Sequence, residues 1–257
     1  MTTSPTLQHI LATFDHTWLP PKGLHPSELP CPEATVTALC HEAVTHGFAA
    51  VCVRPEHVPL ARQALGVTSP VQLATVIGFP AKPVTLAQHL AYPVIGACET
   101  TTKLQEISLA HSEGVDELDV VMNVAYFLTD CETGGGFTAM ELKALATAAD
   151  TLPIKLIIET DCLTPEQVVR ATQLAVQCGM ATVKTSTGYV SDGIGATVEV
   201  VSLIKQTLGS HSHVGIKASG GIKTPEQVLA LHQAGATRIG SSRCVALAQA
   251  LQTMALV

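Results

Sequence analysis

Short runs of apolar, β-branched residues alternate with longer segments of helical periodicity along the chain. The pattern predicts eight strands, at residues 13–17, 49–53, 72–77, 117–122, 154–158, 182–185, 214–217 and 237–239. Between them it predicts helices that include residues 32–45, 103–112, 139–151, 165–178, 196–208, 225–233 and 243–254. Strands that alternate with helices form βαβ units, so we expect a parallel sheet.

The strand runs LDVV and LIIE are apolar throughout, which is typical of strands buried on both faces of a parallel sheet. Eight strand–helix units in 257 residues favour a closed (β/α)8 barrel of the TIM type, because an open sheet usually has fewer strands. We therefore expect an α/β protein with one barrel domain over residues 1–257. Segments 19–32 and 81–95 are predicted loop elaborations, which are either functional or tolerated surface insertions.

Two of the predicted helices carry strong start signals. The motif TPEQ occurs at 164–167 and at 224–227, and each copy supplies a threonine N-cap, a proline at the first helical position and a capping-box glutamine. Gly179 and Gly235 suit the C-terminal ends of these helices. We interpret the repeat as shared helix-start chemistry and not as a duplication.

The composition excludes some classes of protein. Hydrophobic residues are 47% and charged residues 14% of the chain, and the mean hydropathy is +0.34, so the chain can bury a large core. The net charge of −7 and the lack of a dense Lys/Arg cluster argue against nucleic-acid binding. A small anion can still bind locally through backbone N–H groups.

The eight cysteines form no C-x-x-C pair, so we interpret them as reduced thiols and not as a disulfide framework. The first residues lack the charged segment and long apolar run of a signal peptide. No uncharged apolar stretch reaches the roughly 18 residues that a membrane span needs. We expect a cytoplasmic protein that does not enter a membrane.

Polar residues fall at the predicted strand ends, where a barrel enzyme has its active site. These are Asp15, Cys52, Arg54, Asp119, Asn123, Glu159, Lys184, Lys217, Gly240 and Ser241. Two lysines, Lys184 and Lys217, end consecutive strands, and neighbouring strands lie only about 4.8 Å apart.

That proximity has a consequence for reactivity. A free lysine has a pKa of about 10.4, but a neighbouring cation and a dry site both favour the neutral amine. One lysine can then attack a carbonyl while the other polarises it, with Asp119 as a proton shuttle. The alternative is that Lys184 and Lys217 are interior ion-pair partners of Asp119 and Glu159. The pattern leaves both interpretations open and does not choose between the two lysines.

Glycines suggest a phosphate site. Gly220 and Gly221 follow the seventh predicted strand, and Gly240-Ser241-Ser242 follows the eighth, directly before a helix. Barrels often bind phosphate with these two loops, although ordinary tight turns are the alternative. His16 is expected to pack within its strand, and His211 and His213 to lie in a solvated loop. No His, Cys or carboxylate spacing suggests a zinc site.

Several segments resemble the signatures of the deoxyribose-phosphate aldolase family, and they occur in the family's order. They are FDHT (14–17), AVCVRP (50–55), VDELDVVMN (115–123), KLIIET (155–160), VKTSTG (183–188), GIKASGG (215–221) and RIGSS (238–242). The resemblance implies a class I aldolase that uses no metal or other cofactor. It also implies reversible cleavage of 2-deoxy-D-ribose 5-phosphate to D-glyceraldehyde 3-phosphate and acetaldehyde.

The resemblance also implies roles for single residues. Lys184 would form the Schiff base, Lys217 would lower its pKa, and Asp119 would relay protons. Together with the glycine loops it assigns substrate binding to Asp15, Cys52, Lys155, Thr185, Gly188, Gly220, Gly221, Gly240, Ser241, Ser242 and Arg243. The expected partners are small phosphosugars and aldehydes and a second copy of the chain, as a homo-dimer or homo-tetramer.

The chain departs from the family's pattern in five places. Arg243 occupies a phosphate-side position, Tyr189 stands where relatives have lysine or phenylalanine, and Arg54 where asparagine or tyrosine is more usual. Segment 81–95 is an insertion, and no aromatic residue follows Tyr189 to act as the C-terminal tyrosine of some relatives. These departures bear on phosphate affinity and on closure of the site.

Three alternative functions remain at this stage. The first is another phosphate-binding barrel lyase that forms a Schiff base with a different aldehyde. The second is a non-catalytic phosphosugar-binding protein that retains the fold. The third is a barrel enzyme that uses pyridoxal phosphate. Substrate profiling and the visible absorbance of the protein distinguish them.

Overall fold

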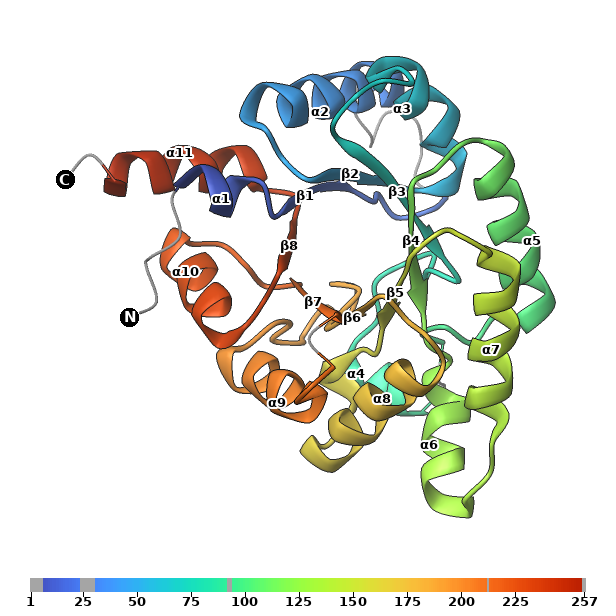
Figure 1. Ribbon diagram of the computed structural model, residues 1–257. Coiled ribbons are helices and arrows are strands. Elements are labelled where there is room, and N and C mark those ends of the chain that lie inside the picture. The colour runs from blue at the N-terminus through green and yellow to red at the C-terminus, as the bar shows by residue number, and fades with distance from the viewer. Residues whose placement is uncertain (1–6, 24–30, 92–93, 212, 256–257) are drawn as a thin grey trace.

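The fold is a closed barrel of eight parallel strands whose order around the barrel is their order in the sequence. It is seen in a computed structural model that describes residues 7–23, 31–91, 94–211 and 213–255 (Figure 1). The strands are β1 (Phe14–Trp18), β2 (Ala50–Val53), β3 (Gln72–Ile77), β4 (Glu117–Val121), β5 (Ile154–Ile157), β6 (Thr182–Lys184), β7 (Gly215–Ser219) and β8 (Arg238–Ser241). The predicted barrel is therefore confirmed, and each strand lies within two residues of its predicted bounds.

Helices surround the barrel (Figure 1). The longer ones are α2 (Pro32–His46), α3 (Val58–Leu65), α5 (Thr100–Ser112), α6 (Val124–Thr133), α7 (Phe137–Ala149), α8 (Pro165–Gln177), α9 (Val198–Leu208), α10 (Pro225–Ala234) and α11 (Cys244–Ala255). Short elements are α1 (Leu7–Leu11), α4 (Leu86–Ala91) and the 3-10 turns η2 (Pro55–His57) and η3 (Thr160–Cys162). α1 packs beside α11, which brings the two ends of the described chain together.

The predicted capping boxes are present at both TPEQ motifs. Thr164 and Thr224 each accept a hydrogen bond from the backbone of the glutamine three residues later, and the glutamine side chain returns to the cap. Gly235 ends α10 in the left-handed conformation, as predicted. The helix predicted at 103–112 begins three residues earlier, at Thr100, because the backbone N–H of Thr102 already bonds to Glu99.

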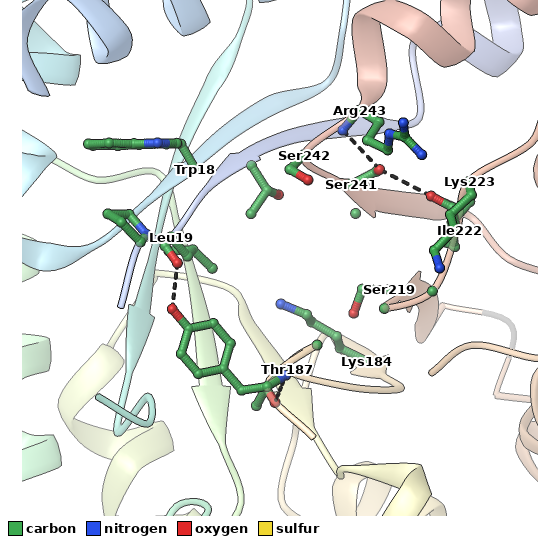
Figure 2. Close-up of a pocket in the computed structure, with 17 residues that line it drawn as sticks. Trp18, Leu19, Lys184, Thr187, Ser219, Ile222, Lys223, Ser241, Ser242 and Arg243 are labelled. Carbon is green, nitrogen blue, oxygen red and sulfur yellow. Dashed lines mark hydrogen bonds between the residues drawn. The ribbon is translucent and has the colours of Figure 1, made fainter. Parts of the chain in front are cut away.

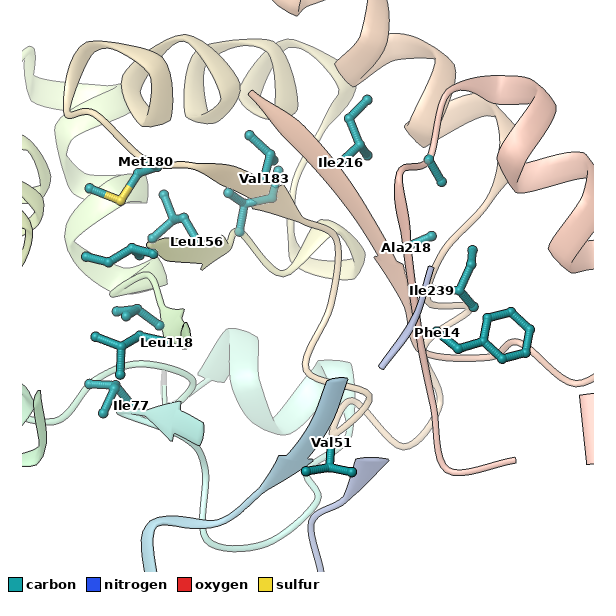
Figure 3. Close-up of a cluster of buried hydrophobic side chains, with 14 of the residues drawn as sticks. Phe14, Val51, Ile77, Leu118, Leu156, Met180, Val183, Ile216, Ala218 and Ile239 are labelled. Carbon is teal, nitrogen blue, oxygen red and sulfur yellow. The ribbon is translucent and has the colours of Figure 1, made fainter. Parts of the chain in front are cut away.

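Alternation along the strands separates an apolar face from a polar one. Side chains such as Phe14, Leu118 and Ile216 point outward and pack against the helices (Figure 3). Because successive side chains on a strand point to opposite faces, their neighbours Asp15, Asp119 and Lys217 point into the barrel. The main core thus lies between strands and helices, and the barrel interior holds charges.

Segment 81–95 folds back onto the loop that follows β6. Val84 forms an isolated parallel bridge with Val190, and the segment contains the short helix α4. The backbone N–H of Lys22, from the other predicted elaboration, donates to Ala81 O at 2.7 Å, whereas residues 24–30 of that elaboration lie outside the described ranges. In the described part of the chain, no helix is both long enough and apolar enough to cross a bilayer.

Candidate active site

A cavity of about 390 Å³ opens at the carboxyl ends of the strands, within the size range of small-molecule sites. Four stretches of chain line it, each at the end of a strand and in the loop that follows: residues 17–20 at β1, 184 and 187–189 at β6, 219–223 at β7, and 240–243 at β8. Figure 2 shows Trp18 and Leu19 across the cavity from Lys223 and Arg243, with Lys184 below them. The position agrees with the strand-end location expected for barrel enzymes.

Beneath the cavity, the buried carboxylate of Asp119 binds three lysines. Its Oδ2 accepts from Lys184 Nζ at 2.6 Å and from Lys217 Nζ at 2.7 Å, and its Oδ1 accepts from Lys155 Nζ at 3.0 Å. The strand register explains the cluster, since Asp119 lies opposite Lys155 and Lys184 lies opposite Lys217. All four residues are at most 3% exposed.

A second layer of charge lies next to this cluster. Asp15 Oδ2 is 2.5 Å from Lys217 Nζ, and Arg238 Nη2 lies 2.6 Å from Asp15 Oδ1. Glu117 Oε2 is 2.6 Å from Lys155 Nζ and 2.8 Å from Arg238 Nη2. The network therefore contains four basic groups but only three carboxylates, so it is balanced when one of its lysines is neutral.

The geometry singles out Lys184 as that lysine. Lys184 pairs with one carboxylate of the network, whereas Lys217 pairs with both Asp119 and Asp15. Burial lowers the pKa of Lys184, and the charge of Lys217 lowers it further against the opposing effect of Asp119. Burial also acts on Lys217, but Asp119 and Asp15 outweigh it and the pKa of Lys217 is raised. For Asp119, burial raises the pKa, but the three lysines hold it well below its usual range.

The ion-pair interpretation of the two lysines is confirmed for Asp119, and the same arrangement leaves Lys184 at the cavity. Lys184 and Lys217 are interior ion-pair partners of Asp119, and Lys184 also lines the cavity. Lys217 is not among the described lining residues. Lys184 therefore both lines the cavity and has fewer carboxylate partners than Lys217. Strand spacing alone did not distinguish the two lysines.

Glu159 does not join the lysines, contrary to the alternative that paired it with them. Its buried carboxylate accepts from the backbone N–H of Thr187 at 3.1 Å and from Thr187 Oγ1 at 2.5 Å. The residue is left-handed, with φ at 55°, which costs a non-glycine residue about 1–3 kcal/mol. Burial, against the hydrogen bonds of Thr187, raises its pKa to about 7. Glu159 therefore holds the β6 loop that carries Gly188 and Tyr189.

The glycine loops after β7 and β8 form one side of the cavity. At Gly221, a Cβ atom would lie 2.2 Å from Ile194 O, and at Gly240 it would lie 3.0 Å from Lys217 Cε, so close backbone approach requires glycine at Gly221. Ser241 Oγ accepts from the backbone N–H of Arg243 at 3.1 Å. The loop after β8 leads directly into α11, and a helix start beside a glycine loop suits an anion.

Arg243 lies directly before α11, one residue outside the first turn in which the sequence predicted it. The helix begins at Cys244, because Ser241 closes a local turn with the Arg243 backbone. The Arg243 side chain lines the cavity and forms no ion pair with any residue that the structure describes. Lys223 also lines the cavity. Lys223 was not predicted as a site residue from the sequence. Its position two residues after Gly221 could have indicated it.

Four other predicted residues lie outside the cavity lining. Asp15 and Lys155 are part of the charged network, and Cys52 Sγ is 4.0 Å from Asp119 Oδ2. Burial raises the pKa of Cys52 to about 11, so it is a neutral thiol. Thr185 is buried between strands, where its Oγ1 donates to Ser219 O at 3.0 Å. Across residues 7–23, 31–91, 94–211 and 213–255, no three His, Cys, Asp or Glu side chains are grouped as metal ligands.

Comparison with known proteins places this barrel in a family. The family model described as DeoC/LacD family aldolase matches residues 13–246. The chain belongs to this family of aldolases. Its members are carbon–carbon lyases, so the protein is an enzyme and not a sugar-binding barrel without activity.

Individual relatives cover nearly the whole chain. A deoxyribose-phosphate aldolase 1 of Cutibacterium acnes is 39% identical over 241 residues, which are 93% of this chain and 96% of that protein. Another, of Bacillus licheniformis, is 38% identical over 245 residues, 95% and 96% of the two chains. A tetrameric deoxyribose phosphate aldolase of Aeropyrum pernix superposes with a TM-score of 0.75 over 97% of this chain and 93% of that one, at 23% identity, and shares the fold.

Glu159 generates a prediction about stability and pH. Above pH 7 the folded state holds a desolvated, ionised carboxylate, whereas the unfolded chain ionises it near pH 4.5 without that cost. The penalty is thus fully present above pH 7 and is relieved as the pH falls toward 4.5. Each pKa unit is worth about 1.4 kcal/mol, so the rise from 4.5 to about 7 sets an upper bound of about 3 kcal/mol.

Glu159→Gln should therefore increase the free energy of unfolding more at pH 8 than at pH 5, by at most about 3 kcal/mol. Urea unfolding at both pH values measures this difference. The control is Glu132→Gln, at an exposed glutamate on α6. Its effect on the free energy of unfolding should be the same at both pH values. An equal effect of Glu159→Gln at both pH values would contradict the assigned ionisation.

Proposed function

We propose that this aldolase reversibly cleaves 2-deoxy-D-ribose 5-phosphate to D-glyceraldehyde 3-phosphate and acetaldehyde through a Schiff base on Lys184. One observation carries the proposal: the lysine that lines the cavity is also the one whose pKa is lowered beside a charged Lys217. The relatives named deoxyribose-phosphate aldolase support the choice of substrate. The reaction fits a role in deoxyribonucleotide catabolism. The cysteine pattern predicts that the protein is cytoplasmic.

Lys184 begins the reaction as a neutral amine. Its Nζ attacks C1 of the open-chain sugar, and the carbinolamine loses water to give an iminium ion. Lys217 stays protonated, because Asp119 and Asp15 hold its proton, and its charge keeps the pKa of Lys184 low. Since Lys217 shares the Asp119 carboxylate with Lys184, its charge would also stabilise the oxygen that leaves as water.

The iminium then draws electrons from the C2–C3 bond. That bond breaks as the C3 hydroxyl loses its proton, which releases D-glyceraldehyde 3-phosphate and leaves an enamine on Lys184. Protonation of the enamine at C2 and hydrolysis release acetaldehyde. Asp119 is ionised and 2.6 Å from Lys184 Nζ, so it can accept and return protons directly or through water.

The phosphate is assigned to the loops after β7 and β8. Gly220, Gly221 and residues 240–242 line that side, and Arg243 and Lys223 add positive charge. Backbone N–H groups of these loops would bind the phosphate oxygens. Gly188 lines the cavity next to Lys184, where it admits the carbon chain. We further propose that the protein is a homo-oligomer, a dimer or a tetramer, since the relative from Aeropyrum pernix is described as a tetramer.

Borohydride in the presence of acetaldehyde should attach a two-carbon group to Lys184. Only an iminium is reduced to a stable amine there. Peptide mass spectrometry locates the adduct, and the wild-type protein should also release acetaldehyde from 2-deoxyribose 5-phosphate in the presence of a chelator. An adduct on Lys217 would overturn the assignment of the nucleophile.

Asp119→Asn should lower kcat by roughly 10²–10⁴-fold, because an amide of the same shape does not exchange protons. It should also lower the melting temperature, since removing one partner of a buried ion pair costs about 3–5 kcal/mol. Asp116→Asn is the matched control, because Asp116 pairs with Arg62 at 2.6 Å outside the barrel interior. A loss of kcat below tenfold in the Asp119 variant would be too small for a proton relay.

Arg243→Ser tests the phosphate side with two substrates. A charge-assisted hydrogen bond is worth about 1.5–3 kcal/mol, so KM for 2-deoxyribose 5-phosphate should rise about ten- to a hundredfold. Activity on unphosphorylated 2-deoxyribose should barely change. Equal effects on both substrates, or none on either, would show that Arg243 does not bind phosphate and leave that task to the backbone N–H groups.

A further inference from the structure

Arg54 is buried at the mouth of the barrel, with 1% of its surface exposed. Its guanidinium donates to Pro20 O, to Pro80 O at 3.1 Å and to Tyr189 OH at 2.9 Å. The described acceptors are all neutral oxygens, although a buried arginine is usually paired with a carboxylate. The position therefore needs an explanation beyond charge pairing.

The three acceptors belong to three different loops. Pro20 follows β1, Pro80 follows β3 and Tyr189 follows β6, whereas Arg54 itself follows β2. The guanidinium carbon also lies 5.3 Å from the ring centre of Phe79 and 5.6 Å from that of Tyr189. These cation–π contacts offset part of the desolvation of the charge. One side chain thus joins the rims of four strands.

The Tyr189 hydroxyl forms its hydrogen bonds with other residues of the protein. The hydroxyl donates to Leu19 O at 2.6 Å and accepts from Arg54; Figure 2 draws the bond that ends on the Leu19 carbonyl. Burial raises the pKa of Tyr189 against the effect of Arg54, so the hydroxyl keeps its proton. What Tyr189 offers to the cavity is therefore its ring.

Segment 81–95 supports Tyr189 from outside. The backbone N–H of Val84 donates to Tyr189 O at 2.9 Å, and that of Ser191 donates to Val84 O at 2.8 Å. The backbone N–H of Leu86 bonds to Asp192 Oδ1 at 2.7 Å. The insertion that the sequence left unexplained thus packs behind one residue of the cavity lining.

We propose that Arg54 is a positioning residue that fixes an apolar wall of the cavity, formed by Trp18, Leu19, Pro20 and Tyr189, and that this wall limits the size of the donor aldehyde. The inference rests on the proposed function. Lys223 and Arg243 lie across the cavity from Trp18 and Leu19 (Figure 2). With the phosphate held on their side and C1 on Lys184, the wall faces the unphosphorylated end of the chain, which is the donor.

Because the Tyr189 hydroxyl already bonds to Arg54 and Leu19, the wall does not offer it to the donor aldehyde. The wall therefore selects donor aldehydes by their size. One methylene group more or less in such a pocket changes kcat/KM by about 10- to 200-fold. A wall held by a buried guanidinium and a backbone carbonyl resists displacement, so the wild-type enzyme should use acetaldehyde at least tenfold better than propanal, with glyceraldehyde 3-phosphate as the acceptor.

The experiment measures the ratio of kcat/KM for propanal to that for acetaldehyde. Tyr189→Phe keeps the ring and removes both hydrogen bonds, and Arg54→Met keeps the bulk and removes the donors. Each should raise the ratio at least fivefold, and Arg54→Lys should give an intermediate value. Tyr126→Phe, on the exposed face of α6, is the control and should leave the ratio unchanged. If a variant loses activity equally with propanal and acetaldehyde, the ratio does not change.

Two further measurements separate the possible failures. The double variant Arg54→Met/Tyr189→Phe should change the ratio no more than the larger single change, because both substitutions break the same contact. Exchange of the acetaldehyde methyl protons with deuterated water reports on the Schiff base alone. If the wild type shows no exchange, the proposed function fails. If it exchanges and the ratio is unchanged in Tyr189→Phe and Arg54→Met, the wall is not what limits the donor.

Discussion

Asp119 accepts hydrogen bonds from three buried lysines, and the site depends on that excess of cations over carboxylates. Each buried charge is costly to desolvate, so the network is favourable only when its charges are closely balanced. Asp15 and Glu117 neutralise Lys217, Lys155 and Arg238 in part, which leaves Lys184 as the amine with the least to gain from a proton. The barrel interior thereby lowers the pKa of one lysine without a dedicated base.

That balance requires fixed positions, and the strands provide them. Asp119 is hydrogen-bonded across the sheet to the strand of Lys155, and Lys184 to the strand of Lys217. The opposite face of each strand is apolar and packs on the helices, so a shift of register by one residue would move the charges into the hydrophobic core. The burial of residues such as Phe14 and Leu118 therefore also fixes the distances in the charged network.

The parts of this arrangement that follow from local patterns were predictable from the sequence. Alternating runs gave all eight strands, and the TPEQ motifs gave the starts of α8 and α10. Strand ends brought Lys184, Lys217 and Asp119 to one place, but local pattern does not show that Lys217 faces two carboxylates and Lys184 one. The partner of Glu159, the burial of Thr185 between strands and the contacts of Arg54 all depend on residues far apart in the sequence.

The two halves of the site are built from different interactions, and this suits their tasks. Charges in a dry interior interact strongly, so a small displacement in the lysine network changes the pKa of Lys184. The wall around Tyr189 is held instead by hydrogen bonds to backbone carbonyls of two loops, those after β1 and β3, and by an inserted segment behind it. Loops tolerate insertion and substitution far better than barrel strands do. Arg54, Tyr189 and segment 81–95, which were expected from the sequence to depart from the family's pattern, all lie in this outer part. The charged network can therefore stay constant while the shape of the cavity changes around it.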